Sequence, residues 1–356
     1  MVTQEQIARK LGISRQLVTF ALAGYPQVSE SSRKRILATA QKMGYRPNPH
    51  ARALKRARTG IIGLWIPDQI SSHYGRVTRE LNHLAKQAHH ELIITDVAGD
   101  RTIAQVLSNV PMDAVFAVDA PHAVKAHIET TASVPVISLG AHCPDETDFV
   151  RVDLYTGAAK AMQHLINAGF RRIIHATFER TSQPHTGRRQ AYEEAMQRAS
   201  LEPEFLYYPL SEQQRPIVRQ SIQDYIRQQG TPEAIFCHSD DVALGIYRGL
   251  YDLKLRVPQD VALVGCDGIQ DTEYLESPLT TLVQPVAEMC EIAWQFLLNR
   301  LGNPTLPRQT AVLEPELVIR DSSRRLAPLA RRMEGINPKS ESPKSEREIQ
   351  EGFNHG

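Results

Sequence analysis

Cysteine, long apolar runs and catalytic patterns are all scarce in this chain of 356 residues. Its four cysteines are widely spaced and form no CxxC pair, which argues against disulfides and a zinc site. No apolar run approaches membrane-spanning length, and the N-terminal MVTQEQ lacks the pattern of a secretion signal, so we expect a cytoplasmic protein outside the membrane. The phosphate-binding patterns GxxxxGK(S/T) and GxGxxG do not occur, nor does a nucleophile–base pair at a recognisable spacing. We therefore expect no enzyme activity, no metal and no cofactor.

Acidic residues are rare in one part of the chain. Residues 1–58 contain twelve Lys or Arg and two Glu, a net charge of +10. The other 298 residues contain 29 basic and 38 acidic side chains, a net charge of −9. A small basic head on a larger acidic body indicates a nucleic-acid-binding module joined to a body with a different role.

Residues 3–22 carry the pattern of two short helices. Thr3 and Gln6 can form a capping box, and apolar residues then recur at helical spacing. Gly12 suits the left-handed conformation that ends a helix, and Ser14 can cap the next one. This helix-turn-helix plan is typical of DNA-reading heads.

The second helix is expected to leave four side chains on its outer face. Arg15 can hydrogen-bond guanine bidentately, and Gln16 can do the same for adenine. Thr19 suits a phosphate oxygen, and Phe20 can contact a thymine methyl group. Two alternatives stay open: a solvated amphipathic hairpin, and a Phe20 that packs against Tyr25 instead of reading a base.

A third helix is expected from Ser31 or Ser32 to Met43, and a basic hinge follows it. The hinge, residues 47–58, can form a helix of about two turns, which is too short to be stable alone in water. We expect it to order only on DNA or on a partner. Leu54 is a lone large apolar residue there, so it is either a wedge in the minor groove or a linker residue that rests on the next domain.

The body alternates short β-rich runs with amphipathic helical stretches. Strands are expected at residues 61–66, 92–95, 114–118, 134–138, 173–177, 234–237 and 261–266, and a further strand-like run at 311–319. Helices are expected at residues 75–88, 124–131, 156–168, 189–199, 214–228, 241–252 and 285–301. This alternation predicts parallel sheets with helices on both faces, and the strands are too many for one sheet. The fold class is therefore a small all-α head plus a two-lobed α/β body, and the chain crosses between the lobes more than once.

Ligands of such sheets bind beyond the carboxyl ends of the strands, here between the lobes. Polar residues stand just after several expected strands. They are Asp68, the expected loop Ser71-Ser72-His73-Tyr74, Asp119, Ser239, Asp240, Asp241 and Asp267. Each one taken singly could instead cap a helix or form a turn. Together they predict a polar binding cleft.

The stretches VTQEQIARKLGISRQLVTFALAGYPQVSESSRKRIL and GYRPNPHARALK resemble the head and hinge of the lactose-repressor/galactose-repressor (LacI/GalR) family of transcription factors. Residues 60–322 resemble the periplasmic-binding-protein-like body of the same family. The resemblance implies a homodimer on a near-palindromic double-stranded DNA operator. One departure is Ala23, where the family usually has Asn.

The resemblance also implies roles for individual residues at the DNA. The implied base readers are Arg15, Gln16 and Phe20. The implied backbone contacts are Thr3, Thr19, Ser29 and Asn48. The implied minor-groove hinge residues are Ala51, Arg52, Leu54 and Lys55.

For the cleft, the resemblance rests on the stretches GRRQAY, FCHSDDVALG and VALVGCDGIQDTEYLESPLTTLVQP. It implies that Asp267 hydrogen-bonds ligand hydroxyls and that Arg188 binds the ligand, with Arg189 as a rival. Ser239 stands where the family commonly has Asn, which leaves open a DNA binder without an effector. The full implied set is Ser72, His73, Tyr74, Asp119, Arg188, Ser239, Asp240 and Asp267.

The expected organisation is a DNA-binding head at 1–46, a hinge at 47–58, an effector-binding and dimerisation domain at 59–323 and a disordered tail at 324–356. The expected function is transcriptional repression controlled by a small molecule, with a carbohydrate as the leading choice. Nucleosides, phosphorylated sugars and no effector stay open. A solute-binding protein would share the body but would need an export signal and no basic head.

Overall fold

The computed structural model describes residues 2–45, 58–67, 71–97, 110–130, 134–178, 187–209, 211 and 213–325. The expectations for the hinge before Arg58, for Asp68 and for the tail beyond residue 325 fall outside the described residues. Among the hinge residues this applies to Asn48, Ala51, Arg52, Leu54 and Lys55.

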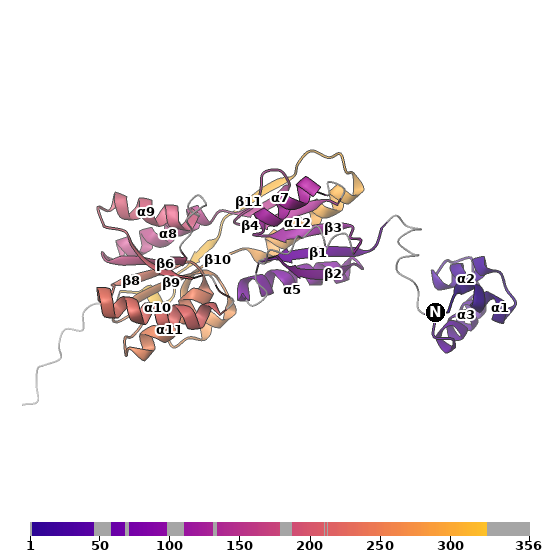
Figure 1. Ribbon diagram of the computed structural model, residues 1–356, viewed down its shortest axis with the longest axis horizontal. Coiled ribbons are helices and arrows are strands. Elements are labelled where there is room, and N and C mark those ends of the chain that lie inside the picture. The colour runs from indigo at the N-terminus through magenta and orange to yellow at the C-terminus, as the bar shows by residue number, and fades with distance from the viewer. Residues whose placement is uncertain are drawn as a thin grey trace, which may run out of the picture.

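Three helices form the head: α1 (Gln4–Leu11), α2 (Arg15–Leu22) and α3 (Glu30–Lys42) (Figure 1). The Thr3 side chain accepts a hydrogen bond from the Gln6 amide while the Gln6 side chain accepts one from the Thr3 amide, so the predicted capping box is present. The third helix begins earlier than predicted, because the Ser29 hydroxyl accepts a hydrogen bond from the Ser32 amide and caps it.

One large apolar side chain from each helix fills the centre of the head. Ile7, Val18 and Ile36 are at most 1% exposed, and the small Ala8 and Ala21 lie beside them. Such small residues let the helices cross closely.

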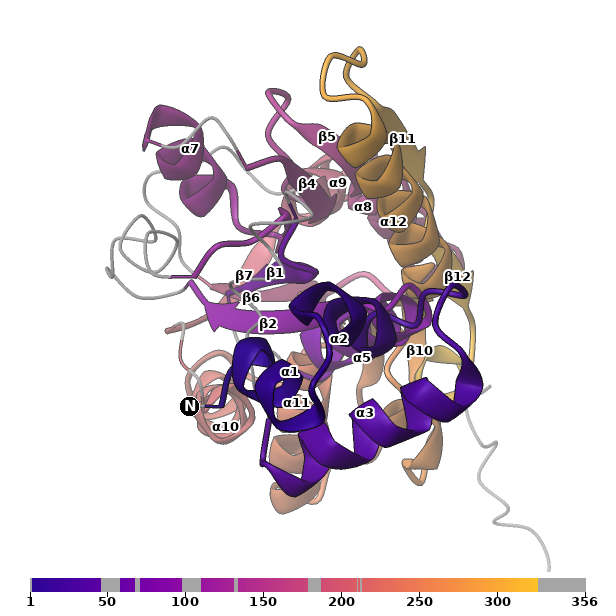
Figure 2. The same cartoon turned by 90° about the vertical axis from the view of Figure 1, so that its right-hand side faces the viewer.

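The body contains two six-stranded sheets. The first has the strand order β11-β5-β4-β3-β1-β2 and is parallel throughout. Its lobe contains β1 (Ile61–Ile66), α5 (Ser72–Gln87), β2 (Glu91–Asp96), β3 (Ala114–Val118), α7 (Pro121–Thr130), β4 (Val136–Gly140), β5 (Asp148–Val152), α12 (Val286–Gly302) and β11 (Thr310–Leu313). Helix α12 packs against α5 and against β4 and β5 (Figure 2). We call this unit the first lobe.

The second lobe has the strand order β12-β10-β9-β8-β6-β7, and only β12 is antiparallel to its neighbour. It contains α8 (Leu154–Asn167), β6 (Ile173–Phe178), α9 (Gly187–Arg198), β7 (Glu204–Tyr208), α10 (Gln214–Gln229), β8 (Ala234–Cys237), α11 (Asp240–Asp252), β9 (Ala262–Asp267), η1 (Gln270–Tyr274), β10 (Thr280–Val283), β12 (Glu316–Val318) and η2 (Asp321–Ser323). The predicted fold class is confirmed: a three-helix head and two α/β lobes built on parallel sheets.

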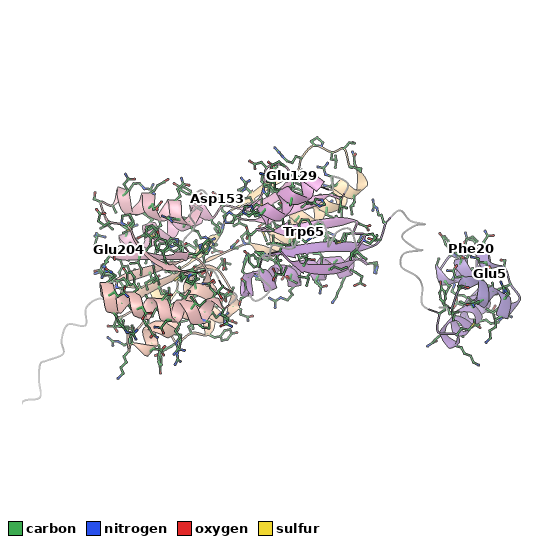
Figure 3. The ribbon with its side chains drawn as sticks, viewed as in Figure 1. Glu5, Phe20, Trp65, Glu129, Asp153 and Glu204 are labelled. Atoms are coloured by element: carbon green, nitrogen blue, oxygen red, sulfur yellow. The ribbon has the colours of Figure 1, made fainter. Side chains whose placement is uncertain are left out.

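The chain passes between the lobes three times: from β5 to α8, from β10 to α12 and from β11 to β12. Asp153 stands at the first passage (Figure 3), where its carboxylate accepts hydrogen bonds from the Tyr155 and Thr156 amides and caps α8. The single strand predicted near the C-terminal end is wrong. It is two strands in different sheets, and Pro315, which has no N–H to donate to a ladder, lies between them.

Asp148 ties three elements of the first lobe together. Its side chain is 3% exposed and forms a bidentate ion pair with Arg300 of α12, with N–O distances of 2.9 and 2.8 Å. It also accepts hydrogen bonds from the Gln309 amide and side chain, just before β11. Burial alone would raise its pKa, but the hydrogen bonds from Arg300 and Gln309 hold the pKa below the usual value.

Asp148→Ala is expected to lower the free energy of unfolding by about 3–5 kcal/mol, because it removes the carboxylate that compensates the largely buried charge of Arg300. Since the folded-state pKa is lowered, the carboxylate stabilises the fold above its unfolded-state pKa of about 4, and this contribution is lost as the pH falls through the folded-state value. Urea unfolding at pH 7 and pH 3 measures both effects. Glu314→Ala is the matched control, because it removes an exposed pair with Lys160 and should cost less than about 1 kcal/mol. Equal losses in the two variants would contradict this account of Asp148.

Candidate DNA interface and ligand cleft

Helix α2 presents Arg15 and Gln16 to solvent, as predicted. Phe20 is half-buried, and its ring centroid lies 5.2 Å from that of Tyr25 in an edge-to-face arrangement (Figure 3 labels Phe20). The alternative of Phe20 packing against Tyr25 is therefore the arrangement found. A phenyl edge can still contact a methyl group from this position.

The other predicted DNA contacts in the head take part in local hydrogen bonds. Thr3 and Ser29 cap α1 and α3. The Thr19 hydroxyl lies 2.9 Å from the Gln4 side-chain oxygen, and Gln4 donates in turn to the Tyr45 hydroxyl at 3.0 Å. This chain of contacts fixes the start of α1 against α2. The exposed cations of the described head are Arg9, Lys10, Arg15, Lys34, Arg35 and Lys42.

In the body, two predicted cleft aspartates occupy unusual backbone conformations at the carboxyl ends of strands. Asp119 follows β3 with φ 45°, and Asp267 ends β9 with φ 128°. Non-glycine residues rarely adopt such angles, and the ones that do concentrate at functional sites. Asp119 accepts a hydrogen bond from the His142 amide at 2.8 Å, and a Cβ on Gly140 would stand 2.6 Å from its carboxylate. Position 140 therefore requires glycine, because any side chain there would collide with the Asp119 carboxylate.

Ser72, His73 and Tyr74 do not form the predicted loop. They make the first turn of α5, which begins three residues earlier than expected. The Ser72 amide therefore has no hydrogen-bond acceptor within its own helix. That amide donates to the Asp241 carboxylate of the second lobe at 3.1 Å. On the same helix, the Arg76 guanidinium donates to the Gly268 carbonyl at 3.2 Å. Helix α5 therefore joins the two lobes directly.

The two neighbouring arginines of α9 have different surroundings. Arg188 is buried, with one Nη 2.9 Å from His238 Nε2 and the other 3.6 Å from the Cys266 sulfur. Arg189 instead bonds Glu193 and lies over the Phe205 ring. Arg188 is thus the arginine at the carboxyl ends of β8 and β9.

Asp240 and Asp267 lie next to each other, but they differ in their partners. Asp240 accepts hydrogen bonds from the Gly268 amide at 2.7 Å, from the Ile269 amide and from the Thr281 hydroxyl, so it supports the loop after β9. Asp267 accepts a hydrogen bond from the Gln284 side chain at 2.8 Å. Burial raises the pKa of both carboxyl groups, and the charge of Asp267 raises the pKa of Asp240 further.

One predicted position has a structural role, and several polar residues at the same strand ends were not predicted. Ser239 accepts a hydrogen bond from the Val242 amide and caps α11. Asp241 was among the predicted polar residues, but its partner Arg215 was not, and neither were Arg76, Tyr208, His238 and Gln284. Gln284 and Tyr208 follow or end strands that the sequence pattern did not predict, which is why neither was found.

A cavity of about 680 Å³ lies elsewhere in the described part of the chain. Asp113, Val134 and Asp148 line it, at the amino ends of β3, β4 and β5, opposite the edge that carries Asp119. Among the described residues no group of His, Cys, Asp and Glu could hold a metal ion. No helix within the described ranges is long and apolar enough to cross a membrane.

Residues 162–323 match the model of the periplasmic binding protein-like domain family. The ribose operon repressor of Haemophilus influenzae is 29% identical over 329 residues, which cover 90% of this chain and 98% of that protein. Two solved structures share the fold. The Lac repressor dimer bound to operator and the anti-inducer ONPF has a TM-score of 0.75 at 20% identity, covering 90% of this chain and 99% of that chain. A LacI family regulator from Enterococcus faecium with bound ribose has a TM-score of 0.68 at 22% identity, covering 75% and 100%.

Proposed function

Since this chain belongs to the LacI/GalR family of DNA-binding transcriptional regulators, we propose that it is a repressor whose operator affinity is set by a carbohydrate bound between its lobes. The observation that carries the proposal is the pairing of two parts in one chain. One is a helix-turn-helix head with Arg15 and Gln16 exposed, and the other is a two-lobed body with Arg188 and Asp267 buried at its strand ends. The curated relative is a repressor, not an enzyme, in line with the expected lack of catalysis.

The head supports operator binding through charge and shape. Its exposed Lys and Arg side chains can neutralise phosphates, while the outer face of α2 enters the major groove. We propose Arg15, Gln16 and Phe20 as base readers, with Thr3, Thr19 and Ser29 at the backbone. The hinge leucine Leu54 is proposed as the minor-groove wedge. A homodimer on a near-palindromic operator follows from the reading of two half-sites by two identical heads.

The body supports control by a ligand through a shift between lobe arrangements. Bonds from α5 to Asp241 and to the Gly268 carbonyl hold the lobes together, so a molecule bound between them changes the relative stability of open and closed forms. The first lobe begins directly after the hinge, and Arg58 donates there to the Leu301 carbonyl at the end of α12. A change in the lobes thereby alters the spacing of the two hinges in a dimer, and with it operator affinity.

The test is a selection of operator sequences from a randomised duplex library by the purified full-length protein, followed by titration of the selected duplex. A near-palindromic consensus and tighter binding than to a shuffled duplex are expected. Recovery of no consensus would refute sequence-specific binding. Addition of candidate sugars to the same titration separates a ligand-responsive repressor from a family member without an effector.

A further inference from the structure

The cavity of about 680 Å³ in the first lobe lies at the edge of the sheet opposite the ligand cleft. It is bounded by the starts of β3, β4 and β5, by the ends of α7 and α12 and by the loop before β11 (Figure 2). Cavities of about 300–1,000 Å³ are the usual size for small organic ligands. None of its described lining residues belongs to the predicted effector set, so a molecule bound here would leave the cleft free.

About half of the side chains that line this cavity are apolar, and they come from both helices and from the loops. Met112 and Val136 are buried, whereas Ile128 of α7 is 40% exposed although it is a large apolar residue. Covering such a wall removes apolar surface from water, which stabilises the complex. The cavity is therefore suited to a ligand with an apolar part.

Two of the three carboxylates that line the cavity are compensated by the fold itself. Asp148 forms the bidentate ion pair with Arg300. Asp113 accepts hydrogen bonds from the Thr59 amide at 2.6 Å, from the Thr59 hydroxyl and from the Gly60 amide at 2.8 Å. Neither carboxylate is left to neutralise another cation at the cavity.

Two arginines at the cavity have no carboxylate within ion-pair distance among the described residues. The Arg58 guanidinium donates to the Leu301 carbonyl at 2.6 Å, and the Arg308 guanidinium donates to the Asp145 carbonyl. The remaining lining carboxylate, Glu146, is exposed. The described lining thus has two guanidinium groups against one exposed carboxylate, although the body as a whole is acidic.

The loop that carries Arg308 is fixed before any ligand binds. Arg300 donates to the carbonyls of Pro304 at 3.1 Å and Pro307 at 3.0 Å, while Asp148 holds its other side. An ordered backbone loses less conformational entropy on binding than a loose one. The cavity therefore presents its positive charge from a prepared scaffold.

We propose that this cavity binds an organic anion with an apolar body, whose anionic group pairs with Arg58 and Arg308 while its apolar part covers Ile128. A guanidinium matches a phosphate or a carboxylate bidentately, and such bonds are about twice as strong as neutral ones. The site is separate from the cleft and does not depend on the proposed function. Since Arg58 is the last residue of the hinge, the anion binds next to the segment that is expected to order on DNA.

The experiment compares three probes on the full-length protein by calorimetry at millimolar concentration and low salt. Phenyl phosphate has both an anionic group and an apolar body, inorganic phosphate has only the first, and benzyl alcohol has only an apolar body with a hydroxyl group. Phenyl phosphate is expected to bind, and the other two at least about tenfold more weakly. No binding of phenyl phosphate, or equal binding of inorganic phosphate, would overturn the proposal.

Two variants test the arginines, which are both exposed and can be replaced without opening the core. Arg58→Gln and Arg308→Gln are each expected to weaken phenyl phosphate binding by about tenfold, because a charge-assisted bond is lost. Arg227→Gln removes the same charge from the surface of α10 and is the matched control. Unchanged affinity in both cavity variants, or an equal loss in the control, would contradict the site.

A variant of the cleft separates the two sites. Asp267→Asn is expected to bind phenyl phosphate with wild-type affinity, and a loss there would place the anion in the cleft and overturn the proposal. Phenyl phosphate binding by a protein that recognises no operator would leave the cavity site intact and refute only the proposed repressor.

Operator DNA is the alternative partner of the two arginines. If Arg308 contacts an operator phosphate instead, Arg308→Gln reduces the salt dependence of operator binding by about one phosphate contact per head and leaves phenyl phosphate binding unchanged. That pair of results would refute the cavity site. An unchanged salt dependence with weakened phenyl phosphate binding is the result expected here.

Discussion

Arg15→Ala is expected to relax discrimination at one base pair of each operator half-site by about 1–3 kcal/mol, because a bidentate contact with guanine is lost. A dimer places one head on each half-site. If the half-sites are equivalent, the loss of discrimination on the full operator is therefore twice this free energy. Arg15 is suited to this role because it begins α2, is exposed and follows the Ser14 cap that fixes the helix start.

The measurement is a binding series over single base-pair variants of the selected operator. The variant protein should bind the original and the altered base pair about equally at one position and keep its preferences elsewhere. Lys42→Ala, an exposed cation in the last turn of α3, is the control and should weaken binding to all duplexes alike. A uniform loss in Arg15→Ala would show that Arg15 contacts phosphate and reads no base.

Asp267→Ala is expected to abolish the response of operator binding to the sugar while leaving operator affinity without sugar close to wild type. Hydrogen bonds to a charged group contribute about 1.5–3 kcal/mol each, so loss of one raises the sugar Kd by at least about tenfold. Asp267 is buried beside Arg188 and holds a backbone angle that alanine tolerates poorly. Asp267→Asn, which keeps the shape and the contact with Gln284, guards against simple unfolding.

The pH dependence follows from the raised pKa of Asp267. A sugar hydroxyl donates to the ionised carboxylate, so sugar affinity should fall on acidification at a higher pH than an exposed carboxyl group would require. Operator titrations with and without sugar measure the response. Asp224→Ala on the surface of α10 is the control. A full response in both Asp267 variants would place the ligand elsewhere.

The head could be predicted almost completely from the sequence. Its signals are local: a capping box at Thr3, a left-handed Gly12 and a cap at Ser14 each act within one turn of helix. The start of α3 was displaced because Ser29, Ser31 and Ser32 are equally good caps in sequence, and its end was displaced by one residue.

In the body, three strands were not predicted: β5, β7 and β10. Strand β5 carries Asp148 at a buried position, which is stable only because Arg300, 152 residues away, neutralises it. Strand β10 contains Thr281, whose hydroxyl bonds the distant Asp240. Strand β7 lies at the edge of its sheet, half-exposed. Contacts with residues far away in the sequence produce no local hydrophobic pattern, so a strand with polar residues is predicted as a loop.

The sequence predicted the aspartates, Arg188 and His73 as cleft residues, but not Tyr208. Asp119 and Asp267 follow strongly apolar runs, which predict strands from the sequence alone. Tyr208 looks like an ordinary strand aromatic, and His73 looked like part of a loop. Only buried polar atoms that lack a hydrogen-bond partner among the described residues distinguish these two side chains.

The most direct test of ligand-controlled operator binding is fluorescence anisotropy of the full-length protein on its selected operator and on a shuffled duplex, with and without the free sugar that stabilises it. We expect binding to the operator to be at least about a thousandfold tighter than to the shuffled duplex, and the sugar to change operator affinity by about 5–150-fold. Equal affinity for both duplexes, with every sugar without effect, would contradict it.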